Sequence, residues 1–280
     1  MYKPIIRQIR EQKPMIHCIT NSVTARDCAN ILLAIGGSAI MAEAKEEVAE
    51  ITSLCNGLVL NLGMLTKEKL SAMLVAGKRA NELAIPVVLD PVGVGASSFR
   101  KQAVQTLLKK ISVTAIRGNL SEIKVLADQG AKSHGVEKVQ EDILHQGNRE
   151  AIFAMCRELS RRYRAIVVVS GEQDIIADKE DVCLVHNGCG MMSRVTGTGC
   201  QLSALLGAFL AVKSEPEWQG RPFDFYSSLM AVCIMGVCGE LAYEGLTEGE
   251  GNATFGNRLI DMVYHISDEV LLERSRYELV

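Results

Sequence analysis

Segment 195–207 has the residue types and spacing that best fit a reaction centre. It reads Val-Thr-Gly-Thr-Gly-Cys-Gln-Leu-Ser-Ala-Leu-Leu-Gly, a glycine-rich turn that runs directly into an apolar helix. Gly197 and Gly199 have no Cβ, so the backbone there can bend sharply or approach a ligand closely. The first N–H groups of such a helix lack partners within it, and with the helix dipole they favour phosphate. Cys200 would stand among these donors, although a glycine-rich loop before a core helix explains the segment equally well when it is taken alone.

Polar and ionisable side chains also follow three predicted strands, at the point where each strand ends. Asp90 ends the run Pro-Val-Val-Leu-Asp, and Ser170 ends the run Ala-Ile-Val-Val-Val-Ser. Arg117 and Glu122 follow the run Val-Thr-Ala-Ile. Carboxylates bind hard cations such as Mg²⁺, and arginine together with backbone N–H groups neutralises phosphate. Because these are the parts that phosphoryl transfer needs, the pattern predicts this chemistry.

Each of these side chains also has a purely structural interpretation. Asp90 could cap the turn before the next proline, and Glu122 could be a first-turn residue favoured by the helix dipole. Arg117 could lie on the surface, and Ser170 could belong to a simple turn. His17 lies in a short apolar run, so we expect a core histidine there rather than a ligand contact.

The elements that must position these side chains alternate between short apolar runs and longer helical stretches. This alternation predicts a doubly wound, mostly parallel α/β sheet flanked by helices, in a single domain over residues 1–280. Ligands of such sheets bind outside the carboxyl ends of the strands, where the candidate residues lie. The predicted strands are 15–20, 38–41, 57–62, 86–89, 113–116 and 165–170, followed by a hairpin of 174–177 and 182–186. The predicted helices are 24–34, 43–53, 66–83, one that ends at 110, 120–127 and 149–163, with mostly helix from 201 onward apart from a polar loop at 214–222.

Composition supports an α/β core and argues against a nucleic-acid partner. Apolar residues make up 48% of the chain and aromatic residues 5%, which suits a core of Ala, Val, Ile and Leu. The formal net charge is -3 and no sustained basic run occurs, which disfavours a nucleic-acid surface. The short basic clusters at 109–110 and 161–164 are expected to be solvated helix faces, and the polar segment 128–148 is expected to be a loop or insertion.

Cysteine usage and hydropathy predict where the protein resides. No two of the nine cysteines form a CxxC pair, so no zinc site is predicted, and their odd number indicates free thiols in a reducing cytosol. The N-terminus lacks the long apolar stretch of a signal peptide. The apolar runs near 31–42 and 229–239 are too short or too broken by glycine to span a bilayer. We therefore expect a soluble, cytoplasmic protein without a membrane partner.

Four motifs in order make the chain resemble the hydroxyethylthiazole kinases, thiamine-salvage enzymes of the ribokinase-like superfamily. They are His-Cys-Ile-Thr-Asn at 17–21, Asp-Pro-Val-Gly-Val-Gly at 90–95, Arg-Gly-Asn-Leu-Ser-Glu at 117–122 and Val-Thr-Gly-Thr-Gly-Cys at 195–200. The resemblance covers nearly the whole chain. It implies a ribokinase-like three-layer fold and the ATP-dependent, Mg²⁺-assisted phosphorylation of the hydroxyl of 4-methyl-5-(2-hydroxyethyl)thiazole. It also implies a homotrimer whose active sites lie between subunits.

The resemblance also implies roles for individual residues. In the family, the Asp of Asp-Pro-Val-Gly and the Glu of Asn-x-x-Glu help to bind Mg²⁺ and phosphates, which implies a metal site at Asp90 and Glu122. Ser170 stands where the family usually has Thr, which is a conservative departure. The implied nucleotide-binding residues are Arg117, Ser170, Thr198 and Gly199, and the implied thiazole-binding residues are Asn21, Met41 and Gly197.

Cys200 is the implied catalytic residue and also the main departure from the superfamily. Ribokinase relatives generally have an aspartate base there, whereas some thiazole kinases share the cysteine. A thiol with an ordinary pKa of about 8.5 is mostly protonated at neutral pH. A helix N-terminus lowers that pKa while nearby phosphates raise it. We therefore expect Cys200 to orient the substrate hydroxyl rather than to abstract its proton, and we expect turnover to be slow.

Two other functions share parts of this pattern. A related kinase for hydroxymethylpyrimidine or pyridoxal would have similar motifs, and a non-catalytic nucleotide or thiazole sensor would keep the fold without a base. Segment 251–255, Gly-Asn-Ala-Thr-Phe, departs from the Gly-Pro-Gly-Ser-Phe of many relatives, which weakens any assignment of adenine contacts there. Convergence of Asp90, Glu122 and Arg117 on one metal–phosphate site would favour an enzyme over a sensor.

Overall fold

A mostly parallel sheet runs through the centre of the protein in the computed structural model, which describes residues 4–128, 144–213, 217–218 and 220–280. Its parallel strands are β1 (Met15–Ile19), β2 (Ser38–Ile40), β3 (Gly57–Asn61), β4 (Val87–Asp90), β5 (Ala115–Asn119) and β6 (Ile166–Ser170). Its antiparallel strands are β7 (Asp174–Ala177), β8 (Val182–Val185) and β11 (Tyr277–Leu279). Across the described residues the strand order is β11-β8-β7-β6-β5-β4-β3-β1-β2.

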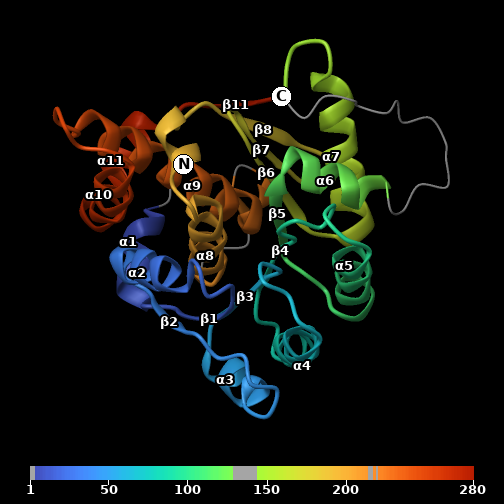
Figure 1. Cartoon of the computed structure of the whole chain (residues 1–280). Coiled ribbons are helices and arrows are strands. Elements are labelled where there is room, and N and C mark those ends of the chain that lie inside the picture. The colour runs from blue at the N-terminus through green and yellow to red at the C-terminus, as the bar shows by residue number, and fades with distance from the viewer. Residues whose placement is uncertain (1–3, 129–143, 214–216, 219) are drawn as a thin grey trace.

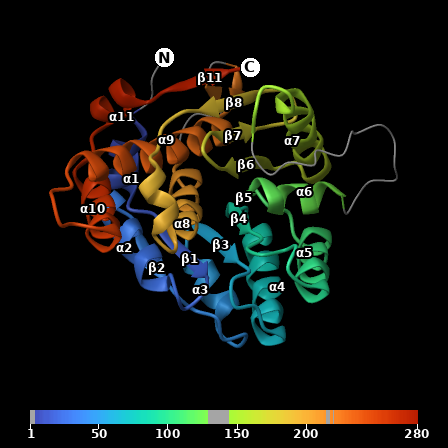
Figure 2. The same ribbon diagram turned by 45° about the horizontal axis from the view of Figure 1, so that its top comes forward.

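Helices cover both faces of this sheet and complete three layers (Figure 1, Figure 2). One layer holds α1 (Ile5–Gln12), α2 (Ala25–Ile35), α8 (Thr198–Leu210), α9 (Phe223–Glu244), α10 (Asn252–His265) and α11 (Asp268–Arg274). The other layer holds α3 (Val48–Leu54), α4 (Lys67–Glu82), α5 (Ser98–Lys110), α6 (Leu120–Asp128) and α7 (Arg149–Tyr163). A one-turn 3₁₀ helix (Gly190–Arg194) and the short strands β9 (Glu217–Trp218) and β10 (Arg221–Pro222) lie outside the main sheet. The predicted three-layer, doubly wound α/β fold is confirmed, and the blue start and red end of the chain share one layer in Figure 1.

Alternating side chains along each central strand fill a core on both faces of the sheet. Leu58 and Leu60 of β3 belong to the core under α3–α7, whereas Val59 between them belongs to the core under α8 and α9. Because helices cover both faces, apolar residues are favoured at every position of such a strand. Polar residues that occur at the carboxyl end of a central strand therefore stand out from the pattern.

The order of connections reverses at β1, which is where a ligand site is expected in an open α/β sheet. β1 lies between β2 and β3, so the chain passes from β1 outward to β2 at the edge and then crosses back over β1 to β3 and the rest of the sheet. Helix α8 packs against β1, β3 and β4 near this reversal (Figure 2). Gly207 approaches Gly57 at the start of β3, whereas Cys200 contacts Asn61 at its end. The N-terminus of α8 therefore lies at the carboxyl edge of the sheet.

The predicted helix 43–53 is wrong in its first part, because α3 begins only at Val48. Glu43 is held in an ion pair with the buried Lys69, whose Nζ lies 2.9 Å from Glu43 Oε2 and also donates to Thr20 O. Residues 45–47 form a turn before the helix, and the pairing of Glu43 with a residue of α4 is a tertiary contact that a pattern along one segment does not reveal.

His17 is the core histidine that the sequence predicts. It is fully buried on β1, with Nδ1 2.9 Å from Thr52 Oγ1 and Nε2 2.9 Å from Ala42 O. Burial lowers the pKa of this imidazole below its ordinary value, so the ring is neutral at pH 7. Its two hydrogen bonds satisfy both ring nitrogens and tie β1 to α3.

The C-terminal half contains two features that the sequence does not predict. β11 is a three-residue edge strand, and so short a run has no alternation that could reveal it. α9 is longer than the apolar run 229–239, and its 22 residues with a mean hydropathy of 1.6 would be enough to cross a bilayer. In the folded protein 89% of the most apolar 18-residue stretch of α9 is buried against the sheet and neighbouring helices, as in the core helix of a globular domain. Most of the predicted loop 128–148 lies outside the described residues.

Candidate active site

The turn before α8 requires glycine for two separate reasons. Gly197 is the N-cap of the helix and has φ +97°, in the left-handed region that favours glycine. A Cβ at this position would also stand 2.7 Å from Thr24 Cγ2 on the neighbouring segment. The turn therefore packs closely against the N-cap of α2, and the first N–H groups of α8 open toward the carboxyl edge of the sheet.

Arg117 is the cation nearest to this helix start. The side chain is 11% exposed, and its Nη2 donates to Ser170 Oγ at 2.5 Å. Its Nη1 lies 3.8 Å from Asp90 Oδ2. A Cβ on Gly199 would lie only 2.4 Å from Nη1, so the absence of a side chain there makes room for the guanidinium. The structure thus brings Arg117, Ser170 and Gly199 together, and their nucleotide-binding role stays a prediction.

Asp90 is fully buried at the end of β4 and is only partly satisfied by its neighbours. Oδ2 accepts hydrogen bonds from Asn61 Nδ2 and Ser203 Oγ, both at 2.7 Å. Oδ1 is buried and has no hydrogen-bond partner among the described residues. Burial raises the pKa of this carboxyl to about 6, while the positive charge of Arg117 opposes the rise. An ionised oxygen without a partner is costly in a folded core and is typical of a ligand site.

Glu122 has the structural role that the sequence allowed as an alternative. Its Oε2 accepts from Asn119 N at 2.9 Å while Asn119 Oδ1 accepts from Glu122 N, a reciprocal cap at the start of α6. Its Oε1 accepts from Gly93 N at 2.8 Å. Its negative charge contributes to the raised pKa of Asp90, so the two carboxylates are close enough to interact. The metal role of Glu122 stays a prediction, and no cluster of three or more acidic, cysteine or histidine side chains forms a metal site in the described residues.

Cys200 lies in the first turn of α8, within a small polar cluster. Its Sγ accepts from Asn61 Nδ2 at 3.3 Å and from Asn21 Nδ2 at 3.5 Å. Burial raises the pKa of this thiol above its ordinary value, and the negative charge of Asp90 adds to the rise. The protonated thiol therefore dominates at neutral pH, in agreement with an orienting role.

Alkylation of Cys200 by iodoacetamide is expected to be slow at pH 7 and to keep accelerating above about pH 9, because the thiolate is the nucleophile and its pKa is raised. Peptide mass spectrometry across a pH series measures this rate at Cys200 separately from Cys189, the other cysteine that is not fully buried. Cys200→Ser serves as the control for the labelled peptide. Fast labelling at pH 7 that reaches a plateau below pH 8 would contradict a raised pKa.

Two hollows lie along the carboxyl edge of the sheet. The larger, about 780 Å³, is lined by Arg117, Ser170, Thr198 and Gly199, which are the four residues predicted to bind nucleotide. The smaller, about 450 Å³, contains Met41 together with Cys18 and Thr20 of the β1 end. Asn21 and Gly197 do not line the smaller hollow but lie beside it, Asn21 directly after Thr20 and Gly197 against Thr24. The start of α8 lines the larger hollow through Thr198 and Gly199, and none of its residues lines the smaller one.

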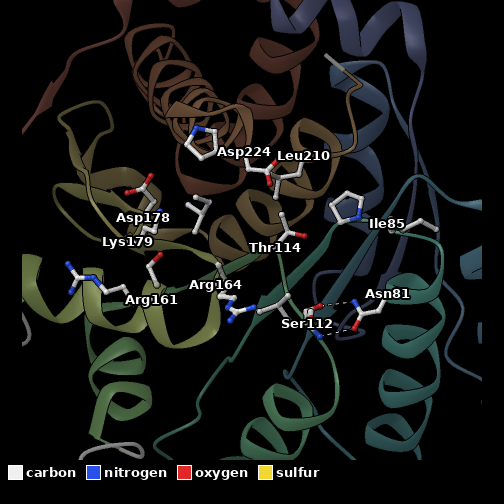
Figure 3. Close-up of a pocket in the computed structure, with 17 residues that line it drawn as sticks. Asn81, Ile85, Ser112, Thr114, Arg161, Arg164, Asp178, Lys179, Leu210 and Asp224 are labelled. Carbon is white, nitrogen blue, oxygen red and sulfur yellow. Dashed lines mark hydrogen bonds between the residues drawn. The ribbon is translucent and has the colours of Figure 1, made fainter. Parts of the chain in front are cut away.

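A third hollow, about 960 Å³, lies at the opposite edge of the sheet (Figure 3). It is lined by residues at the amino ends of β4, β5 and β6, such as Pro86, Thr114 and Ile166. Arg161 and Arg164 are exposed there, which confirms the predicted solvated basic cluster at these two positions. None of the predicted site residues lines this hollow, so it plays no part in the candidate chemistry.

Asn61 and Ser203 belong to the site but were not predicted. Both are buried and both donate to Asp90 Oδ2. Asn61 ends the run Gly-Leu-Val-Leu-Asn, and a polar residue at the end of an apolar strand is the signal that could have revealed it. Ser203 is a small residue inside an apolar helix, and its position gives no such signal.

Comparisons with known proteins agree with this geometry. The chain matches the model of the hydroxyethylthiazole kinase family over residues 6–269. It is 42% identical over 278 residues to the hydroxyethylthiazole kinase of Clostridium acetobutylicum, with 99% of both chains covered, and 42% identical over 269 residues to that of Alkaliphilus metalliredigens, with 96% of this chain and 93% of the relative covered.

Solved structures give the same result. The structure of a hydroxyethylthiazole kinase from Pyrococcus horikoshii matches with a TM-score of 0.83 at 33% identity, covering 99% of this chain and 97% of that chain. Pyridoxal kinase from Staphylococcus aureus, at 14% identity and a TM-score of 0.61 over 96% and 98% of the two chains, shares the fold alone. The chain therefore belongs to the hydroxyethylthiazole kinase family.

Proposed function

We propose that this kinase transfers the terminal phosphoryl group of ATP to the hydroxyl of 4-methyl-5-(2-hydroxyethyl)thiazole, as a cytoplasmic enzyme of thiamine salvage with one catalytic domain over residues 1–280. The observation that carries the proposal is the pair of hollows at the carboxyl edge of the sheet. Arg117 and the start of α8 line the larger hollow, and Met41 lines the smaller one. A nucleotide on one side and a small alcohol on the other would meet at Cys200. Family membership supports the choice of the thiazole as acceptor.

On the nucleotide side, positive charge and backbone donors would bind the phosphates. The guanidinium of Arg117 is held by Ser170 and cannot withdraw into solvent because it is nearly buried. The N–H groups at the start of α8 provide fixed donors for the transferred group. Such preorganised charge is the main source of catalysis in phosphoryl transfer, since the protein needs little covalent chemistry.

The residues at the carboxyl edge also fit Mg²⁺. The free and buried Oδ1 of Asp90 is an oxygen ligand of the kind that this cation prefers. Glu122 would contribute from the neighbouring α6 cap, where each carboxylate oxygen keeps a second lone pair beyond its backbone partner. When bound, Mg²⁺ would neutralise charge on the phosphates. Asp90 and Glu122 are therefore the proposed metal ligands.

On the acceptor side, the protonated thiol of Cys200 would orient the substrate hydroxyl toward the phosphates. Asn21 and Asn61 fix the sulfur by donating to it, and Met41 would contact the thiazole ring from the end of β2. Because the phosphoryl transition state is loose, a hydroxyl can attack before a base has removed its proton. The reaction would then proceed at a modest rate.

Cys200→Asp is expected to raise kcat roughly tenfold, because a carboxylate supplies the general base that the thiol does not, while repulsion from Asp90 limits the gain. Steady-state assays of ADP release with MgATP and the thiazole measure the effect. Cys200→Asn, which has the same shape without the base, is the matched control and should show no gain. An unchanged or lower kcat in Cys200→Asp with intact thiazole binding would refute an orienting role for the thiol.

An acceptor panel tests the proposed function itself. MgATP is supplied with the thiazole alcohol, hydroxymethylpyrimidine or pyridoxal, and ADP release is followed for each. Turnover confined to the thiazole is expected. Turnover on the other rings would favour a related kinase, and thiazole binding without any turnover would favour a sensor.

The homotrimer is likewise a proposal. Met41 and Met64 line the smaller hollow and are 39% and 54% exposed. Val23, which directly follows the lining residue Ser22, is 64% exposed. Apolar side chains that remain exposed around a substrate hollow are typical of a surface covered by another subunit. Light scattering after size-exclusion chromatography should give three times the chain mass.

A further inference from the structure

Asn61 occupies the centre of the site but cannot be a ligand-binding residue itself. It is the last residue of β3, in register with Asp90 at the end of β4, and its side chain is 1% exposed. Protein groups take up every hydrogen-bonding position of its amide, which leaves none for a substrate or nucleotide atom. Whatever it contributes to the reaction must therefore act through its neighbours.

The amide of Asn61 uses its full hydrogen-bonding capacity. Nδ2 donates to Asp90 Oδ2 at 2.7 Å and to Cys200 Sγ at 3.3 Å. Oδ1 accepts from Asn21 Nδ2 at 3.1 Å and from Gly63 N at 2.9 Å. An asparagine has two donor hydrogens and two acceptor lone pairs, so all are engaged.

These partners also fix which way the amide points. Gly63 N is an unambiguous donor, and the short contact to the Asp90 oxygen requires a donor from Asn61. Rotating the amide by half a turn would set its oxygen against the carboxylate and its NH₂ against a backbone N–H. A Cβ on Gly63 would lie 2.9 Å from Asn61 Oδ1 and 2.8 Å from Asn21 Nδ2, so the backbone closes directly over this pair. Asn61 is thus rigidly oriented.

We propose that Asn61 is a positioning residue that orients the Asp90 carboxylate and the Cys200 side chain with one rigid amide, and so keeps the phosphate side and the acceptor side of the site aligned. This inference rests on the proposed function, in which Asp90 serves the metal and phosphates and Cys200 serves the hydroxyl. Small displacements of reacting groups cost orders of magnitude in rate, so one side chain that holds both groups has a large effect without touching either substrate.

Asn61→Ala tests the proposal, and Ser203→Ala is its matched control. Ser203 donates to the same oxygen of Asp90 at the same distance of 2.7 Å, but no hydrogen bond joins it to Cys200 or Asn21. We expect Asn61→Ala to lower kcat on the order of 100-fold while KM for both substrates stays within about threefold. Ser203→Ala should lower kcat by less than about tenfold, because it affects only Asp90, whose Oδ2 keeps the hydrogen bond from Asn61.

A double-mutant cycle with Cys200→Ala provides the readout that a merely structural role would not change. If Asn61 acts partly through Cys200, Asn61→Ala should lower kcat at least about fivefold less in the Cys200→Ala protein than in the wild-type protein. The proposal would be overturned if the effects of Asn61→Ala and Cys200→Ala on kcat simply multiplied. It would also be overturned if Asn61→Ala changed only KM, or if it lowered kcat no more than Ser203→Ala does.

Folding and the proposed function are checked separately. Circular dichroism and thermal melting establish that Asn61→Ala is folded, and Asn61→Ser, which leaves a small polar group, is the second variant if it is not. Wild-type protein that fails to phosphorylate the thiazole alcohol would refute the proposed function. Wild-type turnover with full activity in a folded Asn61→Ala or Asn61→Ser variant would refute only the positioning role.

Discussion

Asp90→Asn is expected to lower kcat by about 10³-fold, the largest effect of any single change in this site. The amide has the same shape, and its oxygen can still accept from Asn61 and Ser203. It loses the charge that faces Arg117, and an NH₂ group replaces the one oxygen that is free of partners. Both losses fall on phosphate and cation binding, so a coupled ADP-release assay at saturating substrates should show nearly the whole effect.

The stability of Asp90→Asn distinguishes this explanation from damage to the fold. Removing a desolvated charge favours the folded state, whereas removing a partner of Arg117 disfavours it. Because these effects oppose each other, we expect the melting temperature to change by less than about 5 °C. Asp178→Asn is the control, since this buried acid accepts from the N–H groups of Glu180 and Asp181 in a turn that lines the hollow at the opposite edge. If Asp90→Asn keeps kcat within tenfold of wild type, the assigned role of Asp90 is wrong.

Arg117→Lys is expected to lower kcat/KM for ATP by about 10²- to 10³-fold although the charge is conserved. The guanidinium reaches Ser170 with one nitrogen and faces Asp90 with the other. A lysine ammonium is a single point that cannot do both, and its shorter reach would leave the nucleotide phosphates without a fixed partner. Initial rates over a matrix of ATP concentrations measure the change.

Gly199→Ala tests the position of the guanidinium independently of its chemistry. The new methyl group would lie 2.4 Å from Nη1, 2.7 Å from Nη2 and 2.9 Å from Cζ of Arg117, so the guanidinium must move. We expect a fall in kcat/KM for ATP of the same order as in Arg117→Lys. Arg79→Lys, at a surface ion pair with Glu82, is the control and should change neither constant by more than about twofold. Normal ATP kinetics in both Arg117→Lys and Gly199→Ala would exclude Arg117 from nucleotide binding.

The chemistry-bearing residues were predictable because they lie at strand ends and in a glycine-rich turn, which are local features of a sequence. Asp90, Arg117 and Ser170 each follow an apolar run, and parallel strands bring such ends to one edge of a sheet. Gly197 and Gly199 were recognisable by type, but their reasons differ in the structure. Gly197 needs a positive φ, whereas Gly199 makes space for a guanidinium from another strand.

Pairwise contacts between distant segments were not predictable from the same patterns. Glu43, in the segment before α3, forms an ion pair with Lys69 of α4. The role of Asn61 depends on four partners, from the segment after β1, from β4, from α8 and from the turn after β3 itself. In each case the free energy comes from groups that are remote in sequence, so no periodicity along one segment records it.

The sequence by itself determined the doubly wound fold, its two apolar cores and the position of the reactive residues along the chain, because hydrophobic period and strand-end chemistry are encoded locally. The tertiary structure alone decided what those residues do to one another. It buries Asp90 with one free oxygen, raises the pKa of the Cys200 thiol, and joins the two through the amide of Asn61. Desolvation and hydrogen-bond geometry exist only once the segments have packed, and they convert a list of candidate residues into an arrangement that favours phosphoryl transfer.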